Sequence, residues 1–366
     1  MDYRMLEQTK SLLPVERFEA EGLREVHGLA AWTDACLNAR APDSVLHHAP
    51  GRLINILPRG IGAAIHWFGV DRGWDQVGVY SLAPVSSVSL GGAVFDPQSR
   101  IIFSPARGAF GPSCGDFDAR HPAAPGRSEA IVTPIAGGQS DDIRHFLYKG
   151  LPAAMMLRGM LGPGLPVVGP VLLAWQAELL TASGLDQDYQ AMTAPTAFSR
   201  IITSDLIGAA MPSRFARAAL DRLRFRFGQT GPRTRRLLVG GAEAAGMVGW
   251  PEIEAAALEF AFETVDLAGL GIAEQARLFA SATAVIGWPG RAMAMVGFCD
   301  PGTVILELHH EPALDHWTQV LAAAFGLEWY GFGIAGLSPA GEADETAGVV
   351  DRPALRACLT RMVGSA

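Results

Sequence analysis

The second half of the chain alternates short apolar runs of strand length with longer runs that repeat apolar residues at helical spacing. The expected strands cover residues 235–240, 262–267, 283–287 and 303–308. The expected helices cover residues 251–260, 272–282 and 313–326, and an Ala/Met-rich run after Gly290 predicts a further helix. Strands that alternate with helices of this length are typical of βαβ units, so we expect a doubly wound parallel sheet in this half.

The first half of the chain has a different pattern of apolar and polar residues. Residues 76–135 alternate apolar and small polar positions between turn signals, which predicts several short strands. Residues 141–160 and 174–185 show helical spacing, and Gly184 is a typical helix stop. Residues 1–75 predict a short helical lead followed by irregular structure.

The arginine-rich stretch 222–236, which also holds two glycines and a proline, predicts the boundary between the halves. We expect an N-terminal α/β domain over residues 1–225 and a C-terminal Rossmann-like nucleotide-binding domain over residues 226–335. Residues 336–366 predict a loop and a helix. A length of 366 residues suits two domains of ordinary size.

Composition and charge limit the possible classes of function. Apolar residues make up 49% of the chain and charged residues 18%, which is enough apolar material for two cores. The formal net charge of −8 argues against a nucleic-acid-binding protein, which needs a basic face. The four cysteines form no C-x-x-C pair, which favours reduced, mostly buried thiols in a cytoplasmic protein over a disulfide framework or a zinc site.

The sequence predicts no transmembrane segment. Its N-terminal residues are charged throughout, unlike those of a signal peptide. The longest apolar stretch, residues 151–175, is interrupted by Arg158 and by several prolines, whereas a span needs about twenty apolar residues. We expect a cytoplasmic location, with peripheral membrane association and the oligomeric state left open.

The segment "IGWPGRAMAM" breaks an expected strand at Gly287, Trp288, Pro289, Gly290 and Arg291. Glycines let the backbone approach a ligand, the N–H groups that open the next helix favour a phosphate, and Arg291 can add a charge-assisted pair. The alternative is an ordinary strand-to-helix turn, because the segment is neither a Walker A loop nor a G-x-G-x-x-G motif.

Glu307 stands at the carboxyl end of the next expected strand. A carboxylate there can accept two hydrogen bonds from ribose hydroxyls, as acidic residues do in nucleotide-binding sheets; the alternative is a solvated charge at a strand end. The titratable cluster over residues 309–316 lacks the H-E-x-x-H spacing, and Pro312 interrupts any helix that would align it. We therefore expect no metal site.

The segment "SDDIRHFLYKGLP" holds Asp141, Asp142, His145 and Lys149. On a helix, His145 and Lys149 are four residues apart and share a face. His145 is a candidate general base or substrate contact, and a structural histidine is the alternative.

The arginines at positions 233, 235 and 236 can bind a phosphate near an interdomain cleft, or they can form a solvated linker. We take Arg235 as the candidate contact. The chain has no G-x-S-x-G elbow, which disfavours a serine hydrolase.

In motif order the chain resembles glycosyltransferase family 61, a group that includes capsular-polysaccharide-type enzymes and xylosyltransferases. The matching segments are "SLAPVSSVSLGGAVFDPQSRIIFSP", "HFLYKGLP", "WQAELLTASGL", "EQARLFASATAVIGWPGR" and "FCDPGTVILEL". These segments fall within residues 84 to 330 approximately, in the order that the family shows. The positions that the resemblance carries over are His145, Gly290 and Glu307.

The resemblance implies an α/β protein of GT-B architecture, with two Rossmann-like domains that face a cleft. It also implies an inverting transfer from a nucleotide-sugar donor, expected to be a UDP-sugar, to a glycan or lipid-linked acceptor in polysaccharide biosynthesis. The donor would bind mainly to the C-terminal half, at Gly290 and Glu307. Gly287, Trp288 and Arg291 are further candidate contacts, which the residues of the loop themselves suggest. No cofactor and no obligatory metal are implied.

Three positions depart from the family pattern: Arg291 replaces the small residue that follows the glycine, and the other two bear on catalysis. Lys149 stands where the family carries an acid, the natural candidate for the catalytic base, and Pro289 stands where the family carries a histidine. One hypothesis is therefore a divergent transferase in which His145, Asp141 or Asp142 serves as the base. A second is a catalytically silent relative that binds a nucleotide, a glycan or a partner enzyme, and a third is an unrelated α/β enzyme.

Overall fold

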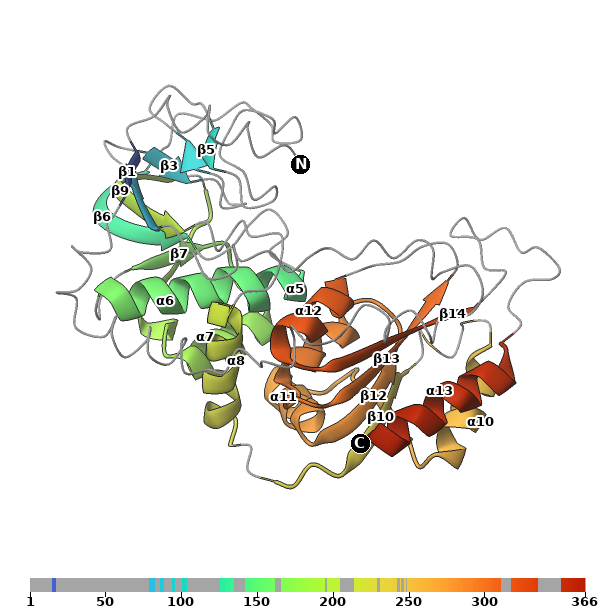
Figure 1. Ribbon diagram of the computed structural model, residues 1–366. Helices are drawn as coiled ribbons and strands as arrows, with labels where there is room; N and C mark the ends of the chain where they lie inside the picture. The colour runs from blue at the N-terminus through green and yellow to red at the C-terminus, as the bar shows by residue number, and fades with distance from the viewer. Residues whose placement is uncertain are drawn as a thin grey trace. The chain divides into compact units, whose positions relative to one another are not determined.

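The computed structural model describes the following residues of the chain: 15–17, 79–82, 86–88, 94–95, 101–103, 126–134, 142–161, 166–194, 196–204, 214–228, 231–241, 244, 247, 249–310, 317–334 and 350–365 (Figure 1). The chain divides into two compact units. Unit 1 comprises Met1–Ala39 and Gly73–Leu223, and unit 2 comprises Arg40–Arg72 and Arg224–Ala366.

Unit 1 contains a mixed sheet with the strand order β5-β4-β3-β9-β6-β7-β8, and β2, which in turn pairs with β1, also pairs with β9. The strands are β1 (Val15–Arg17), β2 (Val79–Leu82), β3 (Ser86–Val88), β4 (Val94–Phe95), β5 (Ile101–Phe103), β6 (Gly126–Pro134), β7 (Val167–Gly169), β8 (Tyr189–Ala191) and β9 (Thr196–Ser204). Strands β9, β6, β7 and β8 run parallel, and the strands from the segment before β6 pair antiparallel.

Local sequence explains part of this mixture in unit 1. Strands β3, β4 and β5 lie close together in sequence, and short turns can join only antiparallel neighbours. The antiparallel pairs of β2 and β3 with β9 join segments that are far apart in sequence. The parallel strands are separated instead by helices, as parallel connections require. Between β6 and β7 lie α5 (Ile143–His145), η3 (Phe146–Gly150) and α6 (Leu151–Leu161), and between β7 and β8 lie α7 (Ala174–Ser183) and η4 (Asp186–Asp188).

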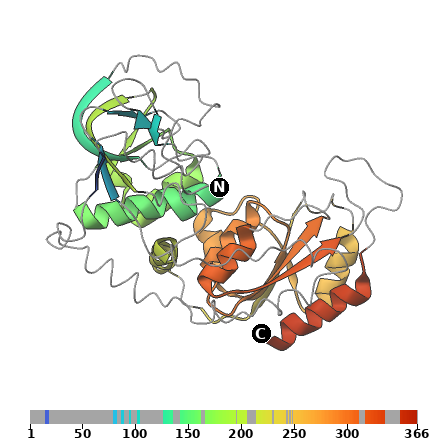
Figure 2. The ribbon, with the colours of Figure 1, turned by 45° about the horizontal axis from the view of Figure 1, so that its top comes forward.

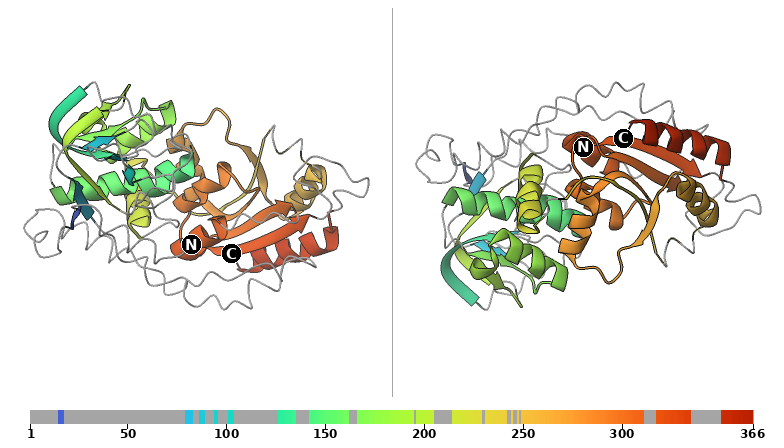
Figure 3. Two further views of the ribbon diagram at one scale, coloured as in Figure 1. Left: turned by 90° about the horizontal axis from the view of Figure 1, so that it is seen from above. Right: turned by 90° about the horizontal axis from the view of Figure 1, so that it is seen from below.

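The helix α6 packs on β6 and β9 of unit 1 (Figure 3). With α5 and the π-helical segment η3 it forms one helical run, whose buried side chains include Phe146, Leu147 and Tyr148. The last helix to begin in this unit, α8 (Arg214–Arg226), follows β9. The parallel part of unit 1 is thus an α/β core, extended on one side by antiparallel strands that a purely Rossmann-like domain does not have.

Unit 2 contains a fully parallel sheet with the order β11-β10-β12-β13-β14 (Figure 2). The strands are β10 (Arg235–Gly240), β11 (Glu263–Asp266), β12 (Ala282–Gly287), β13 (Val304–His310) and β14 (Glu328–Ile334). The helical segments are α10 (Trp250–Glu259), α11 (Ile272–Ala280), η6 (Ala292–Phe298), α12 (Trp317–Phe325) and α13 (Arg352–Ser365). The expected parallel, doubly wound sheet is confirmed, and β14 is an additional strand that the apolar pattern did not predict.

Helices cover both faces of the sheet of unit 2 (Figure 1). On one face, Trp250 and Ile253 of α10 and Leu359 of α13 share an apolar cluster with Leu306 and Phe332 of the sheet. On the other face, η6 packs against both α11 and α12, and α12 packs against β14. A sheet buried on both faces needs strands that are buried without alternation, and residues 304–309 of β13 are all buried, although two of them, Glu307 and His309, are polar.

Two further expectations can be compared with the described residues. Cys299 and Cys358 are buried thiols that form no disulfide within the described residues, and burial raises the pKa of Cys358 to about 11. Cys36 and Cys114 lie outside the described residues. Within the described part of the chain, no helix combines the length and the apolar character that a membrane crossing needs.

Candidate ligand site and candidate catalytic residues

The parallel sheet of unit 2 has a topological switch point between β10 and β12. The chain leaves β10 toward β11 on one side and then returns to β12 on the other side. In sheets of this order, ligands bind in the crevice outside the carboxyl ends of the two strands at the switch point. Leu238 pairs with Ile286, so the carboxyl ends of β10 and β12 lie at the same edge, at Gly240 and Gly287.

Glycines occupy this edge because their surroundings leave no room for side chains. A Cβ added to Gly240 would lie 2.5 Å from a ring carbon of Trp250, and a Cβ added to Gly287 would lie 2.6 Å from Sδ of Met293. Gly241 has a φ of +137°, and an added Cβ would lie 2.7 Å from Oδ1 of Asp266. The backbone at both strand ends is therefore closely packed against neighbouring side chains.

The loop after β12 is different, because its backbone faces open space. Gly290 has a φ of +144°, which L-residues rarely adopt, and none of the residues that the structure describes lies within 4 Å of an added Cβ. Gly290 is half-buried and Arg291 is exposed. Trp288, in contrast, is 9% exposed and belongs to the apolar cluster on the α10 face. Trp288 thus anchors the loop, and the glycine that follows leaves its backbone accessible.

The segment after this loop is not the expected α-helix. Residues Ala292–Phe298 form the 3-10 helix η6, with Arg291 at its N-cap and no side-chain capping hydrogen bond. A 3-10 helix of seven residues offers a weaker dipole to a phosphate than a long α-helix does. The phosphate contact predicted for Gly290 and Arg291 stays a prediction that rests on the open loop.

Glu307 lies within β13 and is completely buried, so the alternative of a solvated strand-end charge is wrong. It is paired in register with Gly287 on one side and Gly331 on the other. The indole Nε1 of Trp329 donates a hydrogen bond of 2.9 Å to Oε2 of Glu307. Nε2 of His309 lies 3.3 Å from the same oxygen.

The polar cluster of Glu307, His309 and Trp329 lies on one face of the sheet. Leu306 and Leu308 belong to the apolar cluster on the α10 face, so the alternating residues Glu307 and His309 point to the face that α11, η6 and α12 cover. All three side chains are at most 4% exposed. Glu307 is therefore not accessible to a ribose in this structure, and the contact between them stays a prediction.

In unit 1, Asp142, His145 and Lys149 lie together at the start of the helical run that follows β6. Asp142 is the N-cap of α5, and its Oδ1 accepts a hydrogen bond of 2.8 Å from the backbone N–H of Arg144. A capping carboxylate of this kind satisfies a backbone donor that the helix leaves unpaired. His145 is 4% exposed, and its Nε2 is buried without a partner among the described residues.

Burial and charge perturb the two basic groups of this cluster. Burial lowers the pKa of His145 to about 4, the charge of Lys149 lowers it as well, and Asp142 acts in the opposite direction. The pKa of Lys149 is also lowered, first by burial and also by Arg144, while Asp142 raises it. The electrostatic influence of Lys149 on His145 shows that the two side chains lie near each other. The shared helix face stays a prediction. His145 is consequently neutral at pH 7.

Arg235 lies at the opposite edge of the sheet from the switch point. It begins β10, and its Nη2 donates a hydrogen bond of 2.8 Å to Oε2 of Glu263. This placement does not favour its predicted contact with substrate, which stays untested.

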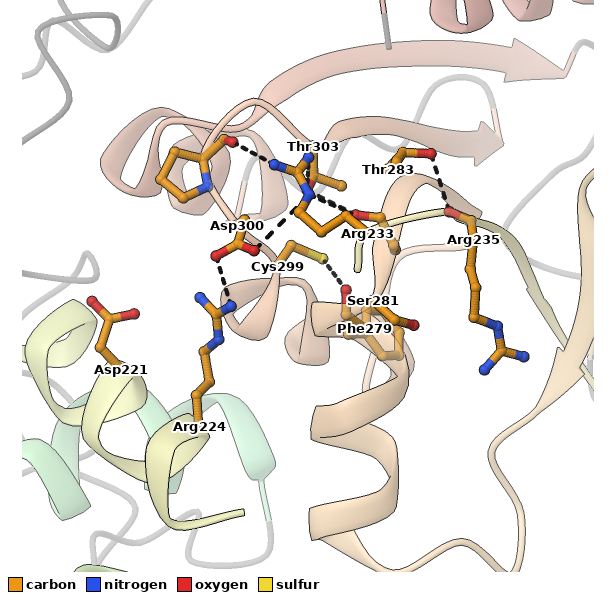
Figure 4. A network of polar contacts seen from close by, with 12 residues as sticks. Asp221, Arg224, Arg233, Arg235, Phe279, Ser281, Thr283, Cys299, Asp300 and Thr303 are labelled. Atoms are coloured by element: carbon orange, nitrogen blue, oxygen red, sulfur yellow. Dashed lines mark hydrogen bonds and ion pairs between the residues drawn. The ribbon is translucent and has the colours of Figure 1, made fainter. Parts of the chain in front are cut away.

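The neighbouring arginines of the linker are also engaged in structural contacts (Figure 4). Arg233 donates hydrogen bonds to the carbonyl oxygen of Pro301 and to Oγ1 of Thr303, over 3.2 Å and 3.1 Å. Nη2 of Arg224 lies 2.6 Å from Oδ1 of Asp300, and Arg236 donates to the carbonyl oxygen of Phe260. Within the described part of the chain, these arginines contact residues near the amino-terminal ends of the strands of unit 2.

The described residues contain no group of three or more metal-ligating side chains. His309, from the cluster that the sequence analysis weighed as a metal site, lies beside Glu307 in the sheet interior. Residues 311–316 of that cluster lie outside the described residues.

Sequence reasoning missed Trp329, the partner of Glu307, and considered His309 only in a metal cluster. The alternation in β13 places residues 307 and 309 on one face, and this signal could have linked them. Trp329 carried no comparable signal, because β14 was not predicted.

A family model described as Glycosyltransferase 61 matches residues 143–306 of the chain. The match contains His145, Lys149 and the loop after β12, whereas Asp142 and Glu307 each lie one residue beyond its limits. It supports the resemblance inferred from the motifs and disfavours an unrelated α/β enzyme. A search among curated proteins gives no match.

Proposed function

The family match supports membership of glycosyltransferase family 61, and from this premise we propose that the protein transfers a sugar from a nucleotide-sugar donor to a glycan or lipid-linked acceptor. The observation that carries the proposal is the switch point of unit 2, where two parallel strands end in closely packed glycines beside an open glycine loop. This is the position at which nucleotide ligands bind to sheets of this order.

In this proposal the diphosphate of the donor lies against the backbone of the Gly290 loop. No side chain blocks Gly290, and Arg291 is exposed at the next position, where its guanidinium can pair with a phosphate. Trp288 fixes the loop by its burial in the core. The proposal includes a UDP-sugar as the donor and binding without an obligatory metal, both of which derive from the family resemblance.

The helical run of unit 1 supplies the candidate groups for proton transfer. An inverting transfer breaks the bond between the anomeric carbon and the nucleotide, forms a bond from the acceptor oxygen on the opposite face, and moves the acceptor proton to a base. His145 is the candidate base because its imidazole is neutral at pH 7 and its Nε2 has no partner among the described residues. The GT-B arrangement of the two units and a cytoplasmic site of polysaccharide synthesis belong to the same proposal.

Calorimetric titration with UDP, GDP and CMP, each with and without a divalent metal, tests the donor site. We expect saturable, metal-independent binding of one of the three nucleotides. Absence of binding in all six titrations would contradict the proposal. Release of the nucleotide from its sugar conjugates in the presence of candidate acceptors then measures transfer.

A second candidate function is a catalytically silent protein that binds a nucleotide, a glycan or a partner enzyme. The observation that favours it is the replacement of the family acid by Lys149, together with a His145 whose lowered pKa makes it a weak base. Nucleotide binding without turnover of any nucleotide sugar favours this second function. Turnover that is lost in His145→Gln and retained in Lys149→Gln favours the first.

A further inference from the structure

The carboxyl group of Glu307 has one occupied oxygen and one unoccupied oxygen. Nε1 of Trp329 donates a hydrogen bond of 2.9 Å to Oε2, whereas Nε2 of His309 lies 3.3 Å from the same oxygen and makes no hydrogen bond among the described residues. Oε1 is buried and has no hydrogen-bond partner among the described residues. Buried polar oxygens are nearly always hydrogen-bonded, so this oxygen marks a place where a donor is missing.

Glu307, whose Oε1 lacks a hydrogen-bond donor among the described residues, lies in the strand next to the switch point. Glu307 is paired with Gly287, the last residue of β12, from which the open loop with Gly290 continues. A carboxylate repels phosphate but accepts hydrogen bonds from hydroxyl groups, and the nucleotide component rich in hydroxyls is ribose.

We propose that Trp329 and His309 are positioning residues, which hold Oε2 of Glu307 and present Oε1 alone to a single ribose hydroxyl of the donor. This inference rests on the proposed function and deepens it. It also changes the expectation from the sequence, in which the carboxylate accepts two hydroxyls. Because Oε2 already accepts the indole N–H of Trp329 and has the His309 ring beside it, Oε1 is the oxygen without a hydrogen bond among the described residues.

The complete burial of Glu307 adds a second consequence. A ribose hydroxyl reaches Oε1 only when the side chains that cover it move, so donor binding includes a local rearrangement of the face beneath η6 and α12. The indole of Trp329 is bonded to the same carboxyl group. Its fluorescence therefore changes when a nucleotide engages Glu307.

The test is a calorimetric comparison of UDP with its 2′-deoxy and 3′-deoxy forms on the full chain. If GDP or CMP is the nucleotide that binds, its deoxy forms replace those of UDP. We expect one deoxy form to bind about tenfold more weakly and the other to bind like the parent nucleotide. In Trp329→Phe and in His309→Asn the difference between the two deoxy forms falls to about twofold or less, because the carboxyl group can turn.

Tyr330→Phe is the matched control. It also removes one polar atom from β14, but Tyr330 belongs to the apolar cluster on the opposite face of the sheet. We expect it to keep the discrimination between deoxy forms and the nucleotide-induced change of fluorescence, which Trp329→Phe loses. Thermal unfolding of each variant confirms that it is folded before its binding is compared.

The outcomes separate this inference from the proposed function. If the parent nucleotide binds and both deoxy forms bind equally well, or equally poorly, the single contact is wrong although the donor site stands. If no parent nucleotide binds to the unaltered chain, the proposed function itself fails. The comparison on the unaltered chain decides the inference even where a variant does not fold.

Discussion

The carboxyl-terminal ends of the parallel strands carry different chemistry in the two units. After β6 of unit 1, the chain places titratable side chains at the start of a helical run, where burial lowers the pKa of His145 and of Lys149. After β10 and β12 of unit 2, it places glycines; Asp266 lies against Gly241, and Glu307 of the neighbouring strand is buried. The first edge carries the candidate groups for proton transfer, and the second carries the glycine loop that is proposed to contact a ligand.

The packing of each unit is consistent with a different role for its strand ends. A histidine that is buried yet unpartnered reduces stability at low pH, and such a cost is typical of functional positions. In unit 2 the strand ends tolerate substitution poorly, because the space around their glycines admits no side chain. The two regions therefore respond to different perturbations, pH for unit 1 and side-chain volume or nucleotide for unit 2.

The largest expected effect is the acid sensitivity that His145 gives to unit 1. Its pKa is about 4 in the folded chain and 6.5 without the fold, so the unfolded state binds the proton more tightly. Stability is unaffected above pH 6.5 and falls as the pH is lowered toward 4. With about 1.4 kcal/mol for each pKa unit, the loss from this group reaches about 3 kcal/mol.

Urea unfolding between pH 7 and pH 4 measures this effect, with His145→Gln as the comparison. We expect the stability of the variant to fall less steeply over this range, because it lacks the group that must be protonated. Parallel pH profiles for the two proteins would show that His145 is not buried as a neutral group.

Gly240→Ala is expected to destabilise unit 2 at the carboxyl end of β10. Its new methyl group would lie 2.5 Å and 2.9 Å from two ring carbons of Trp250, a rigid and buried side chain. Overpacking of this kind costs about 1–3 kcal/mol of unfolding free energy. Chemical denaturation measures the loss.

Gly231→Ala is the matched control for Gly240→Ala, since nothing lies within 4 Å of its added methyl group. We expect its stability to change by no more than about 0.5 kcal/mol. Equal stability of the two variants would contradict the close packing at Gly240.

Glu307→Ala tests whether unit 2 binds a nucleotide through this side chain. If Oε1 accepts a ribose hydroxyl, its removal weakens nucleotide binding by about 1–3 kcal/mol, measured by calorimetric titration. Unchanged affinity in a folded variant removes Glu307 from the site and leaves the Gly290 loop as the remaining candidate.

The smallest effect is expected at the amino-terminal edge of the same sheet. Arg235→Ala removes an exposed ion pair with Glu263, and the stability should fall by less than about 1 kcal/mol. Its nucleotide affinity should equal that of the unaltered chain, because Arg235 begins β10 and the switch point lies at the other end of that strand. A large loss of affinity would instead support the phosphate contact predicted from the sequence.

The sequence alone was sufficient for the local elements of unit 2. Hydrophobic periodicity reports which face of a segment is buried, and it located β10, β12, β13, α10 and α11 within a few residues. It missed β14, because Gly331 and Gly333 interrupt the apolar pattern of that strand. The motif order also indicated the family, since motifs are themselves local.

Only the tertiary structure decided which elements are neighbours and what covers each side chain. The strand order that creates the switch point, the antiparallel extension of unit 1 and the 3-10 form of η6 depend on contacts between distant segments. The burial of Glu307 is the clearest case, because its exposed fraction depends on Trp329, on His309 and on the helices above them. A sequence pattern states what a residue prefers, whereas burial and hydrogen bonding depend on neighbours that the fold supplies.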